Sequence, residues 1–248
     1  MKAILSPAKK LNEKSVFPED LSYTEPVFVD KAAKLVEVLR KFRPQDIAEL
    51  MEISDKMAEM NYERFQQWDK QGEYPAVFLY NGDTYRGLDI KTFPKDKLDK
   101  LQEKVRIISG LYGILRPLDL IMPYRLEMKR KIGADGAADL YEYWRDAVTD
   151  YLNKDLEGEP LVVLASKEYA NVVDRKKLDA PVIDVDFKDN RNGKLRTLGL
   201  FAKRARGAMA RWIAENDIRD PEELKAFDGL GYRYNPEMST NDKMVFVR

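Results

Sequence analysis

Three short apolar runs interrupt an otherwise highly charged chain. Residues 2–5 read Lys-Ala-Ile-Leu, residues 161–165 read Leu-Val-Val-Leu-Ala, and residues 244–247 read Met-Val-Phe-Val. Apolar runs of this length are typical of buried strands, because helices need longer segments. The run at 161–165 is apolar throughout, which predicts a central strand with both faces of its sheet covered.

Helical periodicity marks much of the remaining sequence. Between residues 28 and 42, apolar side chains recur at the spacing of one helix face, at Ala32, Leu35, Val36 and Leu39. The segment before it, residues 6–26, is predicted to be irregular because Pro7, Pro18 and Pro26 interrupt any helix. Further helices are predicted at 44–51, from Ser54-Asp55 onward, at 95–104, from 202 to about 215, and at 221–227.

Two segments carry hairpin signals. Residues 76–80 are predicted to form a strand that turns at Asn81-Gly82, a dipeptide common in tight turns. Residues 181–187 and 195–200 flank the turn-forming run Asp189-Asn190-Arg191-Asn192-Gly193. Together these elements predict an α/β (α+β) fold with a mixed, partly antiparallel sheet and surrounding helices. No repeat and no linker divides the chain, so we expect a single domain over residues 1–248.

The composition excludes several kinds of chemistry. The chain has no cysteine and no histidine. Disulfides, thiolate nucleophiles, Ser-His-Asp catalysis and histidine-ligated metals are therefore excluded, and acid–base chemistry would need Asp, Glu, Lys or Tyr. No apolar run approaches the length of a membrane span, and the run at 2–5 is too short for a signal peptide. We expect a cytoplasmic protein that does not enter a membrane.

Charge is balanced overall but segregated along the sequence. The 43 Lys and Arg residues equal the 43 Asp and Glu residues in number. Residues 190–214 nevertheless hold seven basic residues and no acidic one, and residues 104–131 hold seven basic residues against Asp119 and Glu127. A basic coat over the whole surface is excluded, and two local basic segments remain as candidate contacts for an anionic partner.

The helix predicted from residue 202 has one basic face. Phe201, Ala205, Ala208, Met209, Trp212 and Ile213 share one arc, while Lys203, Arg204, Arg206 and Arg211 share the other. Gly207 and Ala210 lie between the arcs, where small residues would let a phosphate approach the backbone. Because no carboxylate neighbours these cations in sequence, we favour phosphate binding over a merely solvated face.

Residues 108–116 have the spacing of a helix–hairpin–helix element. In such an element Gly110 and Gly113 would permit the tight turn, and backbone amides would contact a DNA phosphate without reading the bases. The alternative is a tight strand-to-loop turn with Leu111 and Ile114 buried, and Pro117 supports it because it disfavours helix just before it.

Other polar residues allow catalytic interpretations. Asp184 and Asp186 alternate on a predicted strand, and with Glu168 they could hold Mg²⁺, although such pairs are more often surface features. The lysines of Ser6-Pro7-Ala8-Lys9-Lys10 follow the first strand, so they are expected at the carboxyl edge of the sheet, where α/β proteins bind ligands. A plain surface loop is the alternative there.

Several segments resemble one bacterial family. They include Ser6-Pro7-Ala8-Lys9, Ser54-Asp55-Lys56-Met57-Ala58, Gly82-Asp83-Thr84-Tyr85-Arg86-Gly87-Leu88, the block from Ser109 to Asp119, Pro123-Tyr124-Arg125-Leu126-Glu127-Met128, Leu164-Ala165-Ser166-Lys167-Glu168-Tyr169, and the block from Ala202 to Met209. Together they resemble the YaaA family of peroxide-stress proteins, from residue 4 to the C-terminus. One departure is Lys129, which stands where family members often have glycine.

The resemblance implies a cytoplasmic protein of the hydrogen-peroxide response that limits damage by free intracellular iron. It also implies a family-specific fold with a positively charged cleft, a helix–hairpin–helix-like element and DNA binding. It brings no catalytic residue, cofactor or metal with it.

We therefore expect a monomeric protein whose partner is double-stranded DNA or a DNA repair intermediate. The candidate DNA-binding residues are Lys9, Gly110, Tyr112, Gly113, Arg116, Arg125, Lys129, Lys203, Arg204, Arg206, Gly207 and Arg211. One alternative is a metal-dependent or metal-independent enzyme acting on nucleotides or nucleic acid, with Lys9, Glu168, Asp184 or Asp186 in its site. Another is a regulatory protein whose basic helix meets an acidic protein surface.

Overall fold

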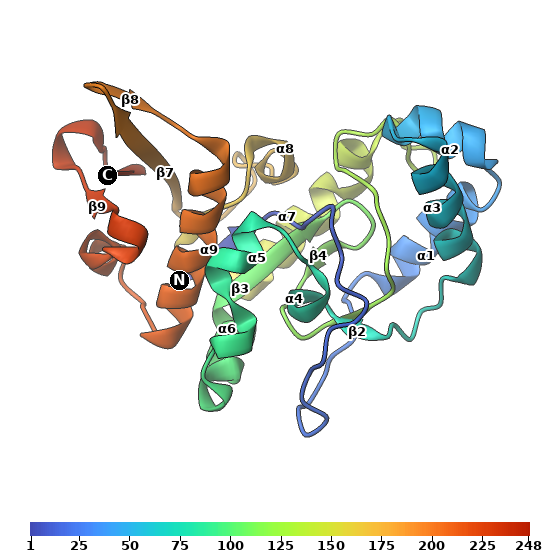
Figure 1. Cartoon of the computed structure of the whole chain (residues 1–248), viewed down its shortest axis with the longest axis horizontal. Helices are drawn as coiled ribbons and strands as arrows, with labels where there is room; N and C mark the ends of the chain where they lie inside the picture. Colours follow the sequence, from blue (N-terminus) through green and yellow to red (C-terminus); the bar gives the residue numbers. More distant parts are fainter.

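A mixed sheet forms the centre of the molecule in the computed structural model, which describes all residues 1–248 (Figure 1). Its eight strands follow the order β4 (Gly113–Leu115), β3 (Val105–Ser109), β1 (Lys2–Leu5), β6 (Leu161–Val163), β7 (Val182–Arg191), β10 (Lys243–Val247) and β9 (Arg233–Tyr234), with β8 (Lys194–Arg196) paired to β7. The four pairings from β3 through β1, β6 and β7 to β10 are parallel, and the outer pairings are antiparallel. The predicted α/β class with a mixed sheet is confirmed.

Burial explains why the apolar runs became the inner strands. Ala3, Ile4 and Leu5 of β1 have no exposed surface, and β6 is buried along its whole length. Parallel strands with helices on both faces need apolar side chains in both directions, which continuous apolar runs provide. A second, two-stranded sheet pairs β2 (Tyr74–Pro75) with β5 (Leu120–Ile121).

Helices surround the sheet. They are α1 (Val29–Leu39), α2 (Pro44–Met51), α3 (Asp55–Gln67), α4 (Ala76–Leu79), α5 (Asp83–Leu88), α6 (Leu98–Lys104), α7 (Leu140–Leu156), α8 (Lys167–Ala170) and α9 (Gly199–Glu215). Short 3₁₀ segments occur at Ile90–Thr92, Lys95–Lys97, Pro221–Ala226, Gly229–Gly231 and Pro236–Met238. Helices α6 and α9 pack on the sheet at β1, α7 packs at β4, and α1, α2 and α3 gather at one side (Figure 1). No helix combines the length and apolar character needed to cross a bilayer.

Most predicted elements are present, but the hairpin at 76–82 is wrong. Residues 76–79 form α4, and Asn81-Gly82 leads into α5. All four residues of α4 are buried, so its apolar run had no exposed side to reveal a period. The other hairpin is present as β7 and β8, although β7 extends to Arg191 and only Asn192-Gly193 form the turn. Its second strand was predicted over residues 195–200, but β8 ends at Arg196 and α9 begins at Gly199.

The helix–hairpin–helix prediction for residues 108–116 is also wrong. The segment forms the antiparallel hairpin of β3 and β4, with Leu111 and Ile114 buried as the strand-turn alternative predicted. Gly113 has a φ of +70°, and the backbone of Gly110 lies against the carbonyl of Leu126. Both glycines are thus required by the turn and its packing, and neither offers its amide to solvent.

A comparison of two glycines tests this interpretation. Gly113 and Gly193 both have positive φ, but a Cβ at Gly113 would lie 2.5 Å from Cε3 of Trp144, whereas a Cβ at Gly193 would meet nothing. Gly193→Ala should cost about 1 kcal/mol of unfolding free energy from backbone strain alone. Gly113→Ala should cost about 1–3 kcal/mol more, because the core cannot accommodate the added methyl group. Urea denaturation of both variants measures the difference, and equal losses would contradict it.

Candidate functional site

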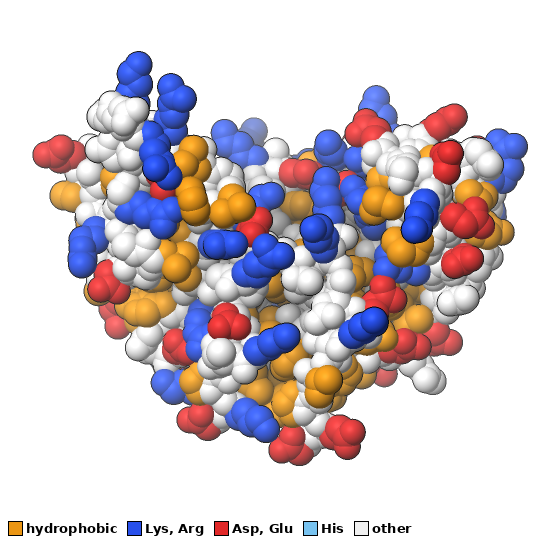
Figure 2. Space-filling model, viewed as in Figure 1, with side chains coloured by type: hydrophobic (Ala, Val, Ile, Leu, Met, Phe, Trp, Pro, Cys, Tyr) orange, Lys and Arg blue, Asp and Glu red, His pale blue; other side chains and the backbone are white.

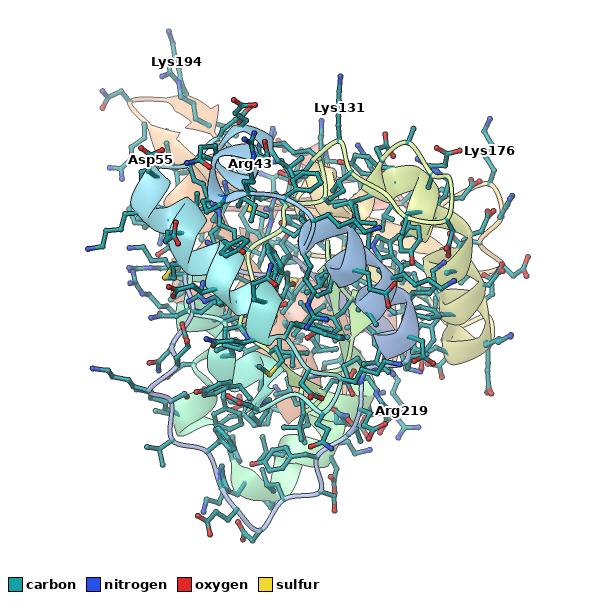
Figure 3. The ribbon with its side chains drawn as sticks, turned by 90° about the vertical axis from the view of Figure 1, so that its right-hand side faces the viewer. Arg43, Asp55, Lys131, Lys176, Lys194 and Arg219 are labelled. Atoms are coloured by element: carbon teal, nitrogen blue, oxygen red, sulfur yellow. The ribbon has the colours of Figure 1, made fainter.

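One edge of the molecule is hollowed between two arms, with Lys and Arg side chains on both arms (Figure 2). The β7–β8 hairpin forms one arm, and α2 with the loop 128–134 forms the other, where Arg130 pairs with Glu52 at 2.8 Å (Figure 1). Lys194 and Lys131 both project from this edge, whereas Arg219 lies away from it, in the lower half of the view (Figure 3). We call this hollow the basic cleft.

The cations of the basic cleft are exposed and lack acidic partners. They are Arg191, Lys194 and Arg196 on the hairpin arm, Lys129 and Lys131 on the loop 128–134, and Lys10 and Lys203 between the arms. Because no carboxylate neutralises them, these cations give this edge of the surface a positive charge. The sequence window 190–214 therefore contributes a real basic surface, chiefly through its first residues.

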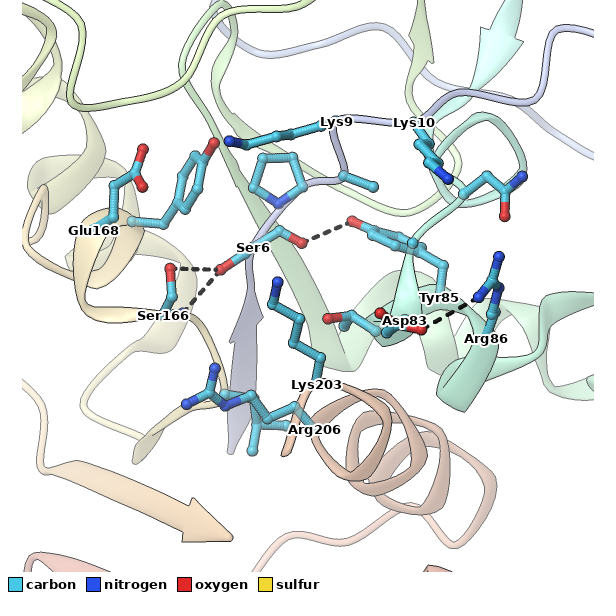
Figure 4. Close-up of a pocket in the computed structure, with 17 residues that line it drawn as sticks. Ser6, Lys9, Lys10, Asp83, Tyr85, Arg86, Ser166, Glu168, Lys203 and Arg206 are labelled. Atoms are coloured by element: carbon cyan, nitrogen blue, oxygen red, sulfur yellow. Dashed lines mark hydrogen bonds and ion pairs between the residues drawn. The ribbon is translucent and has the colours of Figure 1, made fainter. Parts of the chain in front are cut away.

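A pocket of about 480 Å³ opens at the carboxyl ends of β1 and β6 (Figure 4). Its lining comes from the segment after β1, the start of α5, the segment after β6, and α9: Ser6–Lys10, Asn81–Arg86, Leu164, Ser166, Glu168, Tyr169, Lys203 and Arg206. The expected position of Ser6–Lys10 at the carboxyl edge of the sheet is confirmed. We call this cavity the strand-end pocket.

Hydrogen bonds between strand ends fix the floor of the strand-end pocket. The backbone N–H of Ser166 donates to Oγ of Ser6 at 2.8 Å, and Oγ of Ser6 lies 3.3 Å from Oγ of Ser166. The hydroxyl of Tyr85 donates to the carbonyl of Ser6 at 3.1 Å. Helix α5 is thereby attached to the end of β1. The hydrogen bonds thus fix the relative positions of three segments that are distant in sequence: the ends of β1 and β6, and α5.

Two glycines bring α5 and α9 together. A Cβ at Gly87 would lie 1.9 Å from the carbonyl oxygen of Arg204, and one at Gly207 would lie 1.7 Å from that of Thr84. Neither distance is sterically possible, so only glycine allows the helices to cross this closely. The prediction that Gly207 admits a phosphate to the backbone is wrong, because helix α5 occupies that space.

The basic arc of α9 divides between structural and free cations. Arg211 donates to the carbonyls of Leu88 and Asp89 at 3.1 and 2.8 Å, and it pairs with Glu215 at 2.7 Å. Arg204 lies 3.6 Å from Asp83. The expectation that no carboxylate neighbours this arc is therefore wrong, and Arg211 serves to hold the end of α5.

Lys203 and Arg206 remain on the arc and line the strand-end pocket (Figure 4). Burial lowers the pKa of the Arg206 guanidinium, and the carboxylate of Asp186 acts in the opposite direction. That carboxylate is itself paired with Lys243 at 2.8 Å. The buried Nε of Arg206 has no hydrogen-bond partner.

Glu127 gathers several cations predicted to bind DNA. Its carboxylate is 2% exposed and lies 3.0 Å from Nζ of Lys9, 3.2 Å from Arg125 and 3.4 Å from Arg130. Burial alone would raise the pKa of Glu127, but hydrogen bonds from Arg125 and Lys9 outweigh it and lower the pKa to about 2. Arg125 is thus held in a buried ion cluster, and Lys9 extends from this cluster to the strand-end pocket.

The other candidates of the 104–131 window are mostly internal. Arg116 pairs with the buried Asp119 at 2.9 Å. Tyr112 is buried with Gly110 and Gly113, and its hydroxyl accepts a hydrogen bond from Nε1 of Trp68 at 2.9 Å. Of this window, only Lys129 and Lys131 face solvent as unpaired cations.

The carboxylates considered for Mg²⁺ are dispersed. Asp184 pairs with Arg175 at 2.7 Å, and Asp186 pairs with Lys243 at 2.8 Å. Nowhere do three acidic side chains gather in a way that could hold a metal ion. Glu168 lies apart from both, in the strand-end pocket, where it accepts the N–H of Lys129 at 3.4 Å.

Sequence reasoning missed part of the strand-end pocket. Ser166, Tyr169, Asp83 and Arg86 line it but were not among the candidates. Ser166 could have been found, because it follows the predicted central strand just as Ser6 follows the first one. Asp83 and Arg86 could not, because the strand prediction at 76–80 concealed the start of α5.

Comparison with known proteins gives the family. A family model described as "Peroxide stress protein YaaA" matches residues 1–238. The chain belongs to the YaaA family. It is 44% identical to a UPF0246 protein of Marinomonas sp. (strain MWYL1), covering 100% of this chain and 97% of the relative. A UPF0246 protein of Flavobacterium johnsoniae is 44% identical with both chains fully covered, and one of Neisseria meningitidis serogroup A is 45% identical over 99% of this chain and 97% of its own.

The helix crossing of this YaaA family member can be tested on two glycines of α9. Alanine in a helix is normally favoured over glycine by about 1 kcal/mol. Gly199→Ala should therefore leave stability unchanged or raise it, because nothing lies near its Cβ position. Gly207→Ala should instead lower the unfolding free energy by about 1–3 kcal/mol, because the methyl group overlaps Thr84. Denaturation midpoints of both variants measure this, and a stabilised Gly207→Ala would refute the close crossing.

The Glu127 cluster predicts a dependence of stability on pH. A carboxylate whose folded pKa is about 2 stabilises the fold above its unfolded value near 4.5, and the contribution disappears as pH falls toward 2. The unfolding free energy should thus fall with pH in this interval, and the fall should be shallower in Glu127→Gln, which has no carboxylate to protonate. Denaturation of both proteins between pH 5 and pH 2 (about the range of the two pKa values) gives the comparison. Parallel curves would count against the low pKa.

Proposed function

We propose that this YaaA family member binds duplex DNA with little sequence preference through the basic cleft. We further propose that it acts in the cytoplasm during peroxide stress by limiting iron-dependent damage to the bound DNA. The observation that supports this function is the placement of exposed, unpaired cations on both arms of one hollow edge (Figure 2). Its membership of a peroxide-stress family supplies the physiological setting.

The charge pattern favours phosphate contacts over base reading. Most ion pairs of the protein join cations to acids elsewhere in the fold, and the net charge of the chain is zero. The unpaired cations make the basic cleft positive, and the rest of the protein is therefore negative overall. This separation of charge orients a DNA duplex toward the edge that carries the cleft. Lysine and arginine side chains that contact phosphates position DNA without carrying sequence information.

Two arms suit a duplex better than a flat surface would. Arg191, Lys194 and Arg196 belong to the β7–β8 hairpin, Lys129 and Lys131 belong to the loop 128–134, and all five are exposed. Lys194 and Lys131 project from the same edge of the molecule (Figure 3), and Lys and Arg side chains lie on both sides of its hollow (Figure 2). Phosphates on both strands can meet cations when a duplex lies between them. If about five phosphates are neutralised, log K should fall with log[salt] with a slope near −4.5.

DNA binding of this kind connects directly to iron. Ferrous ions gather at DNA phosphates as part of the counterion atmosphere, and there they convert peroxide to hydroxyl radicals. Protein cations that neutralise phosphates release these counterions. The protein has no cysteine or histidine, so peroxide finds few oxidisable side chains in it apart from methionines and aromatic residues.

Single charge-neutralising variants test the basic cleft. Lys194→Gln and Lys131→Gln remove one cation from each arm, and each should weaken binding to a random-sequence duplex and reduce the salt slope by about 0.9. The matched control is Arg219→Gln, which lies away from the cleft edge (Figure 3). Its partner Asp217 still pairs with Lys100 and Lys104, each at 3.1 Å, when Arg219 is replaced. Fluorescence anisotropy over a salt series gives both quantities.

A second readout connects binding to protection. Nicking of plasmid DNA by Fe²⁺ and peroxide should fall when the wild-type protein is added, and Lys194→Gln should protect less than Arg219→Gln. Equal salt slopes for all variants, or strong selectivity for one sequence, would refute the proposed DNA contact. Protection that survives the loss of DNA binding would refute its connection to iron.

A further inference from the structure

Arg206 carries a charge that the fold does not neutralise. A buried or half-buried cation is costly unless it is paired, and arginine offers five N–H donors that need acceptors. The buried Nε of Arg206 has none, and the nearby Asp186 is engaged by Lys243. The guanidinium of Arg206 therefore has donors free for an anionic ligand that enters the pocket.

Lys203 adds a second cation on the same side of α9. Residues three apart lie next to each other on a helix, and both side chains extend into the strand-end pocket (Figure 4). The crossing with α5 at Gly207 fixes the position of this stretch of helix. A guanidinium and an ammonium that line one pocket can together bind several oxygens of a phosphate.

Hydroxyl groups complete the donor set. Ser166 lines the same pocket as Arg206, and Oγ of Ser166 accepts a hydrogen bond from Oγ of Ser6 at 3.3 Å (Figure 4). Its own proton is therefore available to an oxygen of the ligand. Both hydroxyls are held by the ends of the central strands, so they need not reorganise when a ligand arrives.

The other end of the strand-end pocket has a different character. Glu168 lies across the pocket from Lys203 and Arg206, and its carboxylate accepts only one long hydrogen bond (Figure 4). A free carboxylate accepts hydrogen bonds from hydroxyl or amino groups and repels further phosphates. Pro7, Ala8 and Tyr169 add apolar surface between the two ends.

We propose that the strand-end pocket binds a small phosphate monoester of about the size of a nucleoside monophosphate. The phosphate lies at Lys203, Arg206 and Ser166, and the hydroxyl or amino groups of the organic part face Glu168. The volume of about 480 Å³ exceeds the needs of inorganic phosphate and lies in the range of small-molecule sites. Lys10 and Lys203 belong both to the pocket lining and to the basic cleft, but Lys194 and Lys131 lie outside the lining, so variants of these two lysines test DNA binding separately from the pocket.

A DNA phosphate is the other source of the same chemistry. Backbone phosphates carry two ester substituents and follow the surface of a duplex, whereas a terminal phosphate has three free oxygens and can enter a pocket. Arg206 is half-buried in the pocket lining, where a terminal phosphate that enters the pocket can reach it, which favours the monoester. The two sources are separated by testing small ligands and duplex DNA on the same variants.

The experiment uses isothermal titration calorimetry on the full chain. The ligands are AMP, GMP, CMP, UMP, ribose 5-phosphate, inorganic phosphate, adenosine and a duplex oligonucleotide. At least one monoester should bind, inorganic phosphate should bind more weakly, and adenosine should not bind. Arg206→Met and Lys203→Gln should each weaken monoester binding at least tenfold, whereas Arg204→Met, a matched change outside the lining, should alter it less than twofold.

Stability gives an independent measurement. Without ligand, Arg206→Met should be at least as thermally stable as wild type, because it removes an unpaired, half-buried charge. A monoester should raise the melting temperature of wild type and of Arg204→Met, but not that of Arg206→Met. If Arg206→Met fails to fold, Lys203→Gln decides the matter, because Lys203 is exposed.

Three outcomes would overturn the proposal. They are no binding by any monoester, equal binding of AMP and adenosine, and monoester binding that both pocket variants retain. Duplex binding that depends on Arg206 while every monoester fails would assign the pocket to a DNA phosphate. If Lys194→Gln loses DNA binding but still binds the monoester, two separate sites are supported. If the wild-type protein does not bind DNA at all, the proposed function fails but the monoester site is unaffected.

Discussion

Helices α5 and α9 cross with their backbones in contact, because Gly87 faces the carbonyl of Arg204 and Gly207 faces the carbonyl of Thr84. This crossing sets the width of the strand-end pocket, since one helix supplies Asp83 and Arg86 and the other supplies Lys203 and Arg206. Arg211 secures the end of α5, and Tyr85 attaches the same helix to Ser6. The backbone positions of these charged residues are thereby fixed before any ligand arrives, which lowers the entropic cost of binding.

The sequence predicted regular elements well where their apolar pattern had a clear period or a clear boundary. The strands at β1, β6 and β10 and the helices α1, α2 and α9 belong to this group. It failed at 76–80, where burial on all sides removed the period, and at 108–116, where glycine spacing suits a turn between strands as well as one between helices. Short segments like these depend on tertiary contacts that a local pattern does not contain.

The candidate site was predicted in part for a similar reason. Counting charges in a window finds cations but misses partners that are distant in sequence, as in the pairs Arg106–Asp155, Lys104–Asp217 and Arg130–Glu52. Those pairs turn much of the 104–131 window into internal structure. The carboxyl-edge rule for parallel sheets was more reliable, because it depends on topology and applies to Ser6 without knowledge of any partner.

The place of β1 in the sheet has a consequence for biosynthesis. Ala3 pairs with Val105 on one side and with Val162 on the other, so the first strand to leave the ribosome lies between two strands made much later. At roughly 5–20 residues per second, translation leaves this apolar strand without its second neighbour for on the order of ten seconds or more. Helix α9 follows later still, at Gly199–Glu215. Nascent chains therefore lack the pocket until α9 has been synthesised, and one edge of their apolar strand β1 stays unpaired until β6 has been made.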